Sequence, residues 1–339
     1  MKHCKLLLTC LAIFLFFVGP ANAQQGIAIP GSPKGDLPTE LLQCRTYCRS
    51  MERSIQSLEK RFPSLSVEIL AANASWKSSP FAGGCAAIEE DIIKDAGEKG
   101  RAILKKLDDD TWAEAVKHIQ IRSETEARDF LALVDRRAKG EIEVEMVRGN
   151  LLWQYKPFQD TPEKEVARGY VQKVTHTAST DRKIVFETPM SWKSEKSPKT
   201  ELMSFRNCYG HGNVWMTVLV SPTVDELGQT VTAQVKFDAY SEEALRTEYR
   251  RLGIELTSFS KTKVNGMPAL MFTREQPFEQ LGQKATRAAQ VIRAFSGSQM
   301  ISFQINTLGP EGDTKGVDRI KKNEVLFKMV GGSLRVMEP

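Results

Sequence analysis

The stretch Ile184-Val185-Phe186-Glu187-Thr188-Pro189-Met190-Ser191-Trp192 decides the fold of the second half of this 339-residue chain. Its first residues are β-branched or aromatic, which favours a strand, and Pro189 ends that strand because a proline donates no backbone hydrogen bond. Trp192 then fits a large ring that closes the end of a sheet. On both sides of this stretch the chain continues as short strands and turns.

The chain from residue 168 to residue 339 is predicted to be dominated by strands. A strand at 202–206 pairs naturally with one at 214–220, across a turn rich in Gly. Helices are expected at 241–252 and at 317–334. Strands in meanders with helices at defined points indicate an α+β domain, with an antiparallel sheet flanked by helices. The remaining strands are expected at 170–177, 183–187, 254–263, 268–275 and 287–307, the last folded back at residues 296–298.

The first half reads differently, because residues 38–140 carry apolar side chains at helical spacing. One such stripe runs from Leu41 to Leu58, and another resumes at Leu65 after the interruption at Pro63. We therefore predict an N-terminal α-helical domain over 38–140.

Three further helices are expected within that domain. One spans Cys85 to Leu107, and Asp108-Asp109-Asp110 connects it to the next, which runs through Ile119. Ser123-Glu124-Thr125-Glu126 matches a capping box, which places the start of another helix at Glu124.

The hydrophobic period changes after Gly140. Ile142, Val144 and Met146 alternate with three glutamates, which is typical of a half-exposed strand. Pro157 and Pro162 follow in a turn-rich stretch. Residues 141–167 are therefore predicted to connect the helical domain to the strand-rich one, which begins at 168.

The second half resembles the PsbP-like fold, shared by the photosystem extrinsic subunit, a nuclear Ran-binding factor and bacterial envelope proteins of the DcrB type. The resemblance lies in the strand that ends in Pro189-x-x-Trp192 and in the turn Val264-Asn265-Gly266-Met267-Pro268-Ala269-Leu270. It covers residues 168–339 and implies a binding or assembly protein without shared catalytic residues. Pro189, Trp192, Gly266 and Pro268 are then structural residues. The helical half is similar only to uncharacterised exported bacterial proteins.

The N-terminus has the pattern of an export signal. Lys2 and Lys5 precede an apolar run, and Ala21-Asn22-Ala23 forms a small-x-small cleavage pattern. We expect a signal peptide at 1–23, a flexible leader at 24–37, and a periplasmic or secreted mature chain. No later run is long enough for an integral membrane span.

Charge and motifs exclude several partners and chemistries. Loss of Lys2 and Lys5 lowers the formal net charge from +5 to +3, and basic residues are interspersed with acids, so no nucleic-acid partner is expected. Neither a metal-ligand pattern nor a phosphate-binding loop is present, so metal and cofactor sites are predicted to be absent.

The four cysteines expected in the mature chain are disulfide candidates in an oxidising compartment. Cys44 and Cys48 are four residues apart, which places both on one helix face. That spacing favours a crosslink to a second helix, and we expect Cys85 to pair with Cys44 or Cys48, preferably Cys48. The fourth is Cys208.

No catalytic residue is assigned. Cys208 and His211 are the one Cys-His neighbourhood of the expected mature chain, and a thiol beside a base would suit a hydrolase or redox enzyme. A hairpin loop with a buried cysteine is the preferred interpretation. Aromatic residues such as Trp215 alternate on strands and are expected in the core. If a few of these aromatic residues were instead exposed on a concave face of the sheet, they could bind a ligand.

The leading hypothesis is an exported, non-enzymatic envelope protein that acts through protein contacts or a small-ligand groove. One alternative is a thiol-dependent hydrolase or redox enzyme that uses Cys208 with His211, or the Cys44/Cys48 pair. Another is a glycan or lipid binder built on the helical half.

The signal sequence generates a first prediction. Cleavage between Ala23 and Gln24 should give an exported chain that starts at Gln24, because small residues at 21 and 23 follow an apolar core of suitable length. Intact-mass measurement of the exported protein tests this. A retained Met1 or a lipid on Cys10 would contradict it.

Overall fold

The computed structural model describes residues 37–118, 121–177, 183–195, 202–225, 227–280, 283–310 and 315–337. The expected signal peptide, nearly all of the leader and the turn at 179–182 lie outside these ranges. The chain divides into two compact units, Met1–Lys156 and Pro157–Pro339. Each is described by itself.

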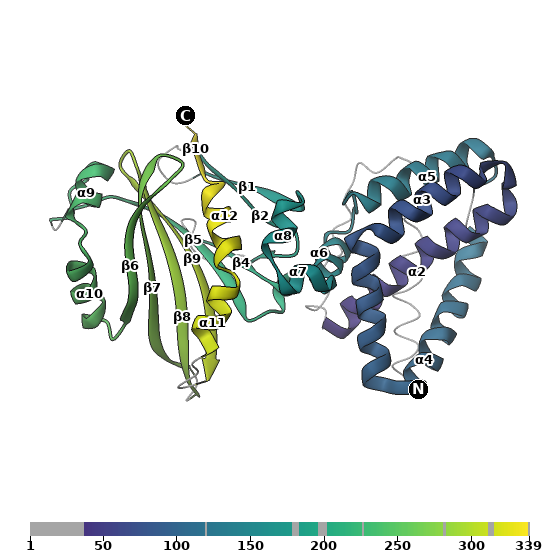
Figure 1. Ribbon diagram of the computed structural model, residues 1–339, viewed down its shortest axis with the longest axis horizontal. Coiled ribbons are helices and arrows are strands. Elements are labelled where there is room, and N and C mark those ends of the chain that lie inside the picture. The colour runs from purple at the N-terminus through teal and green to yellow at the C-terminus, as the bar shows by residue number, and fades with distance from the viewer. Residues whose placement is uncertain are drawn as a thin grey trace. The chain divides into compact units, whose positions relative to one another are not determined.

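The first unit is helical, as predicted. Its helices pack α2 against α4 and α6, and α3 against α5 (Figure 1). The capping box at Ser123 and Glu126 is present, with each side chain bonded to the backbone of the other residue. The elements are α2 (Leu37–Arg61), η2 (Pro63–Leu65), α3 (Ser66–Ser78), α4 (Pro80–His118), α5 (Glu124–Ala138) and α6 (Glu145–Gln154).

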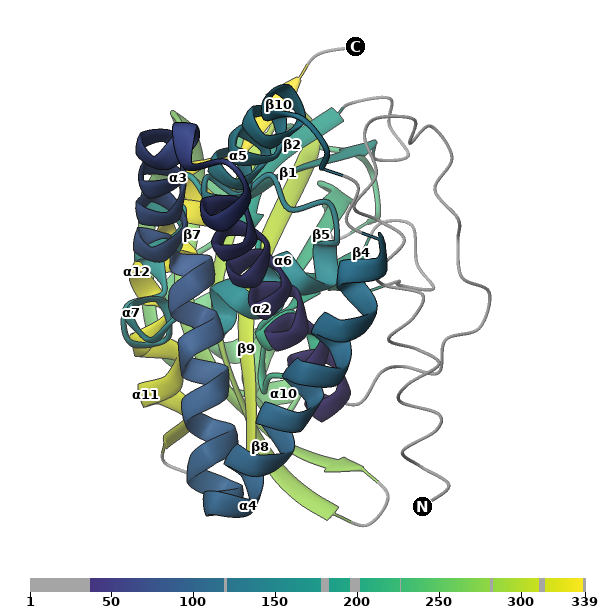
Figure 2. The same ribbon diagram turned by 90° about the vertical axis from the view of Figure 1, so that its right-hand side faces the viewer.

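Helix α4 is broken at Gly97, whose φ of 58° and ψ of −146° are not helical. The two arms turn back on one another at this residue (Figure 2). The predicted break at Asp108-Asp109-Asp110 is wrong, because these residues lie inside the second arm. Only glycine adopts such backbone angles without strain, which explains the position of the break.

A buried arginine holds the two arms of α4 on α2. The Arg45 guanidinium is 1% exposed and donates two hydrogen bonds to the Asp108 carboxylate, at 2.5 and 2.9 Å. Glu89, on the first arm, lies 3.7 Å from the same guanidinium. The buried Arg45 cation is thus paired with a carboxylate from each arm, as a buried charge requires, and Arg49 also pairs with Glu89.

The strand predicted over Ile142, Val144 and Met146 is wrong, because α6 begins at Glu145. Helix α6 packs closely on α4 at Gly84, where a Cβ atom would lie 2.0 Å from the carbonyl oxygen of Leu151. The contact with α4 buries Val147 and Leu151 and stabilises a helix where short-range alternation favours a strand. The predicted connecting segment 141–167 is thus largely helical, with α7 (Lys156–Asp160) and α8 (Glu163–Ala167) after α6.

The second unit contains two antiparallel sheets (Figure 1). The larger has the order β3-β4-β5-β9-β8-β7-β6, and the smaller has the order β1-β2-β10. Together with the helical first unit, this arrangement confirms the α+β class. The strands are β1 (Val171–Thr177), β2 (Lys183–Pro189), β3 (Lys193–Glu195), β4 (Leu202–Arg206), β5 (Val214–Pro222), β6 (Glu255–Val264), β7 (Met267–Gln280), β8 (Gln283–Ser296), β9 (Gln299–Pro310) and β10 (Arg335–Met337).

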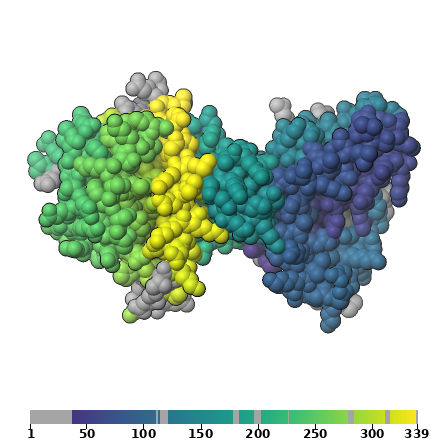
Figure 3. Space-filling model, viewed as in Figure 1, coloured from purple at the N-terminus to yellow at the C-terminus, as the bar shows by residue number. Residues whose placement is uncertain are grey.

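One face of the large sheet carries the main core of this unit. Phe186 of β2 meets Phe303 of β9 edge to face, with ring centroids 5.2 Å apart, and meets Phe205 of β4 in the same way. Helices α11 (Lys315–Lys322) and α12 (Glu324–Gly332) cover the rest of this face with Ile320, Phe327 and Val330. Figure 3 shows α11 and α12 as a continuous yellow band along one side of this unit. The single closing helix predicted over 317–334 is therefore two helices, separated at Asn323.

The opposite face is only partly covered. Helices α9 (Ala233–Ala239) and α10 (Glu242–Arg251) pack on it over β6, β7 and β8. Leu245 and Tyr249 of α10 join Phe272 and Phe295 of the sheet in a second, smaller core. The described residues include no helix that is both long enough and apolar enough to cross a bilayer.

The buried ion pairs of Arg45 with Asp108 and Glu89 generate a second prediction. Arg45→Ala removes the buried cation that bonds Asp108 and leaves this carboxylate only the longer contact with Arg49, which should destabilise the helical unit by about 3 kcal/mol. The matched control is Arg101→Ala, because Arg101 pairs with Glu98 on the surface and should contribute at most about 1 kcal/mol. Urea unfolding of the full chain, followed by circular dichroism at helical wavelengths, compares the two. Equal losses would contradict the role of Arg45.

Candidate functional site

The Pro189-Met190-Ser191-Trp192 turn is held from within the second unit by Glu165 of α8. The Ser191 amide and hydroxyl donate to its carboxylate at 2.8 and 2.6 Å. Glu165 is buried, and this desolvation raises the pKa of its carboxyl to about 7 despite the bonds from Ser191. Trp192 itself is 4% exposed within the main core. The arrangement is a structural clamp around a large aromatic ring.

Gly266 lies in the two-residue turn between β6 and β7. Asn265 and Gly266 have φ of 48° and 80°, and the flanking residues Val264 and Met267 pair directly. An Asn-Gly turn with positive φ at both positions matches the twist of a hairpin. The Asn265 amide also donates to the carbonyl oxygens of Gly332 and Leu334, each at 2.6 Å, which joins the hairpin to the end of α12. Pro268, paired with Lys263, is the second residue of β7.

Three of the disulfide candidates gather inside the helical unit. Cys44, Cys48 and Cys85 are all buried, and the Cys48 thiol is hydrogen-bonded to Cys85. All are thiols in this structure, as is Cys208, and the pairing of Cys48 with Cys85 stays a prediction. Burial raises the pKa of the Cys44 and Cys48 thiols well above the usual range. Protonated thiols are poor nucleophiles, which disfavours the Cys44/Cys48 pair as a reactive site.

Cys208 and His211 lie on the short loop between β4 and β5. Cys208 is 8% exposed, whereas His211 is exposed. The loop takes left-handed backbone angles at Cys208, Tyr209 and Gly210, and the Tyr209 amide donates to the Ser191 carbonyl at 2.9 Å. These contacts tie the loop to the Glu165 clamp and favour the structural interpretation of this neighbourhood.

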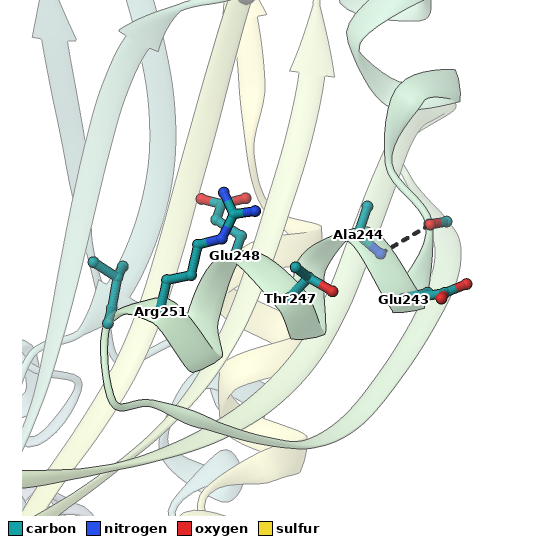
Figure 4. Close-up of a pocket in the computed structure, with 7 residues that line it drawn as sticks. Glu243, Ala244, Thr247, Glu248 and Arg251 are labelled. Carbon is teal, nitrogen blue, oxygen red and sulfur yellow. Dashed lines mark hydrogen bonds between the residues drawn. The ribbon is translucent and has the colours of Figure 1, made fainter.

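A shallow hollow follows the outer side of α10 and is lined by this helix and its flanking residues. Glu243, Thr247, Glu248 and Arg251 project into it (Figure 4). The lining mixes both charges and holds no buried polar group that could orient a ligand. Within the described ranges, no group of three or more His, Cys, Asp or Glu side chains is arranged to hold a metal ion.

The strongest candidate site is the part of the large sheet that α9 and α10 leave uncovered. Residues that pair directly in an antiparallel sheet project to the same face. The registers therefore align one row across five strands. That row comprises Arg206 of β4, Trp215 of β5, Asn306 of β9, Ala289 of β8 and Arg274 of β7.

Trp215 is at the centre of the contacts in this row. The guanidinium of Arg206 lies 5.4 Å from its ring centroid, and that of Arg287, from the next row of β8, lies 5.6 Å away. Asn306 is fully buried between them, and its side-chain oxygen accepts from Nε and Nη2 of Arg287, at 3.2 and 2.8 Å. The buried amide thus orients the Arg287 guanidinium beside the indole. Trp215 is half-buried, unlike its neighbour Met216 in the core.

Arg274 extends this group toward α10. Its Nη2 donates to Gln304 at 3.1 Å, and its guanidinium lies over the ring of Tyr249 at 5.6 Å. Its Nε is buried and makes no hydrogen bond with any described residue. We name Arg206, Trp215, Arg274, Arg287, Gln304 and Asn306 the arginine-tryptophan surface.

The charges of this surface are unevenly balanced. Arg206 is paired with Glu195, at 2.6 Å. Among the residues that the structure describes, no carboxylate lies within 4.0 Å of Arg274 or Arg287. Burial lowers the pKa of both guanidinium groups, and the charge of Arg274 lowers that of Arg287 further. Two like charges therefore lie together in partly desolvated positions.

The sequence pattern does not reveal this surface. Trp215 was expected in the core, and the arginines are far apart along the chain. A regular signal was nevertheless present, because Arg287 and Arg293 interrupt a strand of small and apolar residues at positions of the same parity.

No protein-family model and no curated protein matches the chain. Among solved structures it is similar to the cyanobacterial PsbP (CyanoP) of Synechocystis sp. PCC 6803, at 13% identity over 50% of this chain and 93% of that one, with a TM-score of 0.31. The Ran-binding protein Mog1p of Saccharomyces cerevisiae matches at 9% identity over 49% and 95%, with a TM-score of 0.32. LpqN of Mycobacterium tuberculosis, involved in cell envelope biogenesis, matches at 13% identity over 52% and 98%, with a TM-score of 0.32.

Each of these matches covers about half of this chain and nearly all of the other chain. With identities of 9 to 13%, they assign no ligand to the arginine-tryptophan surface.

Glu165 generates a third prediction. Because the folded state raises its pKa from 4.5 to about 7, the folded state binds the proton more tightly than the unfolded state does. The resulting stabilisation is complete below pH 4.5 and is lost as the pH rises through 7. It amounts to about 3 kcal/mol for this shift.

Glu165→Gln should abolish that part of the pH dependence, since an amide does not titrate. Chemical unfolding of the full chain at pH 4.5 and pH 8 measures it, with exposed Glu98→Gln as the control. If the stability of the Glu165→Gln protein had the same pH dependence as that of the unaltered chain, Glu165 would not be the group whose titration changes the stability.

Proposed function

We propose that this chain is a non-enzymatic binding protein whose partner docks on the arginine-tryptophan surface. The observation that supports this most directly is the placement of Trp215 between two guanidinium groups on an uncovered sheet face. Tryptophan and arginine are the residue types most enriched among the side chains that dominate binding energy in protein interfaces.

The form of the surface favours a macromolecular partner. Small-molecule sites are usually concave and enclose most of the ligand. The arginine-tryptophan surface instead spans five neighbouring strands, β4, β5, β9, β8 and β7, and the hollow over α10 is lined by other residues. Of the two modes of action in the leading hypothesis, protein contacts are therefore better supported than a small-ligand groove.

The export signal adds the compartment to this proposal. With residues 1–23 removed, the chain would meet its partner in the periplasm or outside the cell, which fits an envelope protein.

The alternatives have less support. An enzyme that uses Cys44 and Cys48 would need reactive thiols, whereas the pKa of both is raised by burial. A lipid or glycan binder on the helical half could use Val67 and Leu70, which are 75% and 62% exposed on α3. Neither side chain lines the small hollow of the helical unit that Thr46, Arg49, Ser50, Arg53, Asp108 and Trp112 form.

A fourth prediction tests the binding surface. Trp215→Ala should remove the central contact and abolish capture of a specific protein from envelope extract by the immobilised chain. The control is Leu252→Ala, which removes an exposed apolar side chain beside α10 in the same unit. Quantitative mass spectrometry of the captured proteins provides the comparison, and melting temperatures verify that both variants fold. Identical captured proteins for Trp215→Ala and the unaltered chain would disprove the proposal.

A further inference from the structure

The geometry points to an anion subsite formed by Arg274 and Arg287, and we propose that it binds the carboxylates of an acidic segment of the protein partner. This inference rests on the proposed function, because it names the chemistry of the partner at the same surface. It starts from the two guanidinium groups that have no carboxylate within ion-pair distance among the described residues.

Two neighbouring cations in partly desolvated positions are unfavourable for the folded chain by themselves. Nothing in their surroundings removes the charge, since their hydrogen-bond acceptors are the neutral amides Gln304 and Asn306. Guanidinium groups remain protonated in proteins, so the charge persists. An anionic ligand would offset the repulsion that the fold leaves uncompensated.

The guanidinium groups also retain donor capacity. The Nε of Arg274 is buried and has no acceptor among the described residues, while its Nη2 is held by Gln304. A guanidinium presents five donors in a planar fork, which suits a carboxylate bound through both oxygens. Arg287 is held in a fixed orientation by two bonds to Asn306, which reduces the entropy lost when it binds a ligand.

The spacing of the two arginines fits an extended polypeptide. Arg274 pairs with Ala289, two residues from Arg287 on the same strand, so the two arginines are diagonal neighbours at about 7 to 8 Å. Alternate side chains of an extended segment are separated by about 7 Å along one side. Two acidic residues at positions i and i+2 would thus meet both guanidinium groups.

The remaining charges support an acidic rather than a basic occupant. Arg206 belongs to the same row and carries its own carboxylate partner, Glu195, so the net charge of the surface comes from Arg274 and Arg287. Arg293 also lies on β8, six residues after Arg287. Its positive charge contributes to the lowered pKa of Arg274, so it adds to the positive potential of this face.

The test uses the full chain and a capped peptide of six glutamates, with six glutamines as the uncharged control. Titration calorimetry should show saturable binding of the glutamate peptide that weakens as salt is raised, and no binding of the glutamine peptide. Arg274→Gln and Arg287→Gln should each weaken binding by about tenfold, and the double variant should abolish it. Arg101→Gln removes the same charge from the helical unit and should leave binding unchanged.

A second measurement addresses folding and the kind of anion. At constant ionic strength, the glutamate peptide should raise the melting temperature of the unaltered chain but not that of the double variant. Arg287→Lys keeps the charge and loses the fork, so it should bind more weakly than the unaltered chain and better than Arg287→Gln. Inorganic phosphate is the competing probe. Stabilisation by phosphate without any response to the peptide would overturn the acidic segment as the occupant.

Failure of this inference is distinguishable from failure of the proposed function. If the double variant binds the glutamate peptide as well as the unaltered chain does, or if neither binds it, the anion subsite is wrong. The docking surface would still stand if Trp215→Ala lost its captured protein. Conversely, arginine-dependent binding of the peptide with unchanged capture by Trp215→Ala would support the subsite and refute the proposed function.

Discussion

The alternation of side chains along antiparallel strands is the constraint on which the second unit depends. Because alternate residues of each strand project to opposite faces, the two faces of the large sheet can be covered differently. The main core takes one face, through β2, α11 and α12. On the other, α9 and α10 pack over β6, β7 and β8, with Tyr249 of α10 against Arg274, and the row continues beyond them to Arg206 of β4. The like charges of Arg274 and Arg287 on this face are the observation on which the proposed binding role depends.

The helical unit has a different organising interaction, the buried pairing of Arg45 with Asp108 and Glu89. It joins both arms of α4 to α2, which also brings Cys48 and Cys85 together beneath the same contacts. A Cys48–Cys85 disulfide would reinforce that junction. The buried ion pairs and the buried thiols described in this unit lie between its helices. The large sheet offers charged groups that its own fold leaves uncompensated, which is why the proposed site lies there.

Much of the fold was predictable from the sequence, because its signals are local. The strand-turn-strand patterns, the capping box at Ser123 and the Asn265-Gly266 turn each depend on neighbouring residues. The errors arose where tertiary packing prevails. Residues 142–146 alternate like a strand, yet contact with α4 makes most of that stretch helical, and Asp108 looked like a linker residue although it pairs with Arg45. The candidate surface could not be predicted for the same reason. Trp215, Arg274 and Arg287 are far apart in the sequence, and only the pairing of four neighbouring strands brings them to one face.

The most direct test of the account follows the indole N–H signals of the five tryptophans by NMR while the six-glutamate peptide is added to the isotope-labelled full chain. Trp215→Phe assigns the signal of interest. The account predicts a saturable shift of the Trp215 signal, with the buried Trp76 and Trp192 signals unchanged, because the peptide would seat its carboxylates on the arginines around that ring. A Trp215 signal that stays fixed at saturating peptide, or shifts equally with the glutamine peptide, would contradict it.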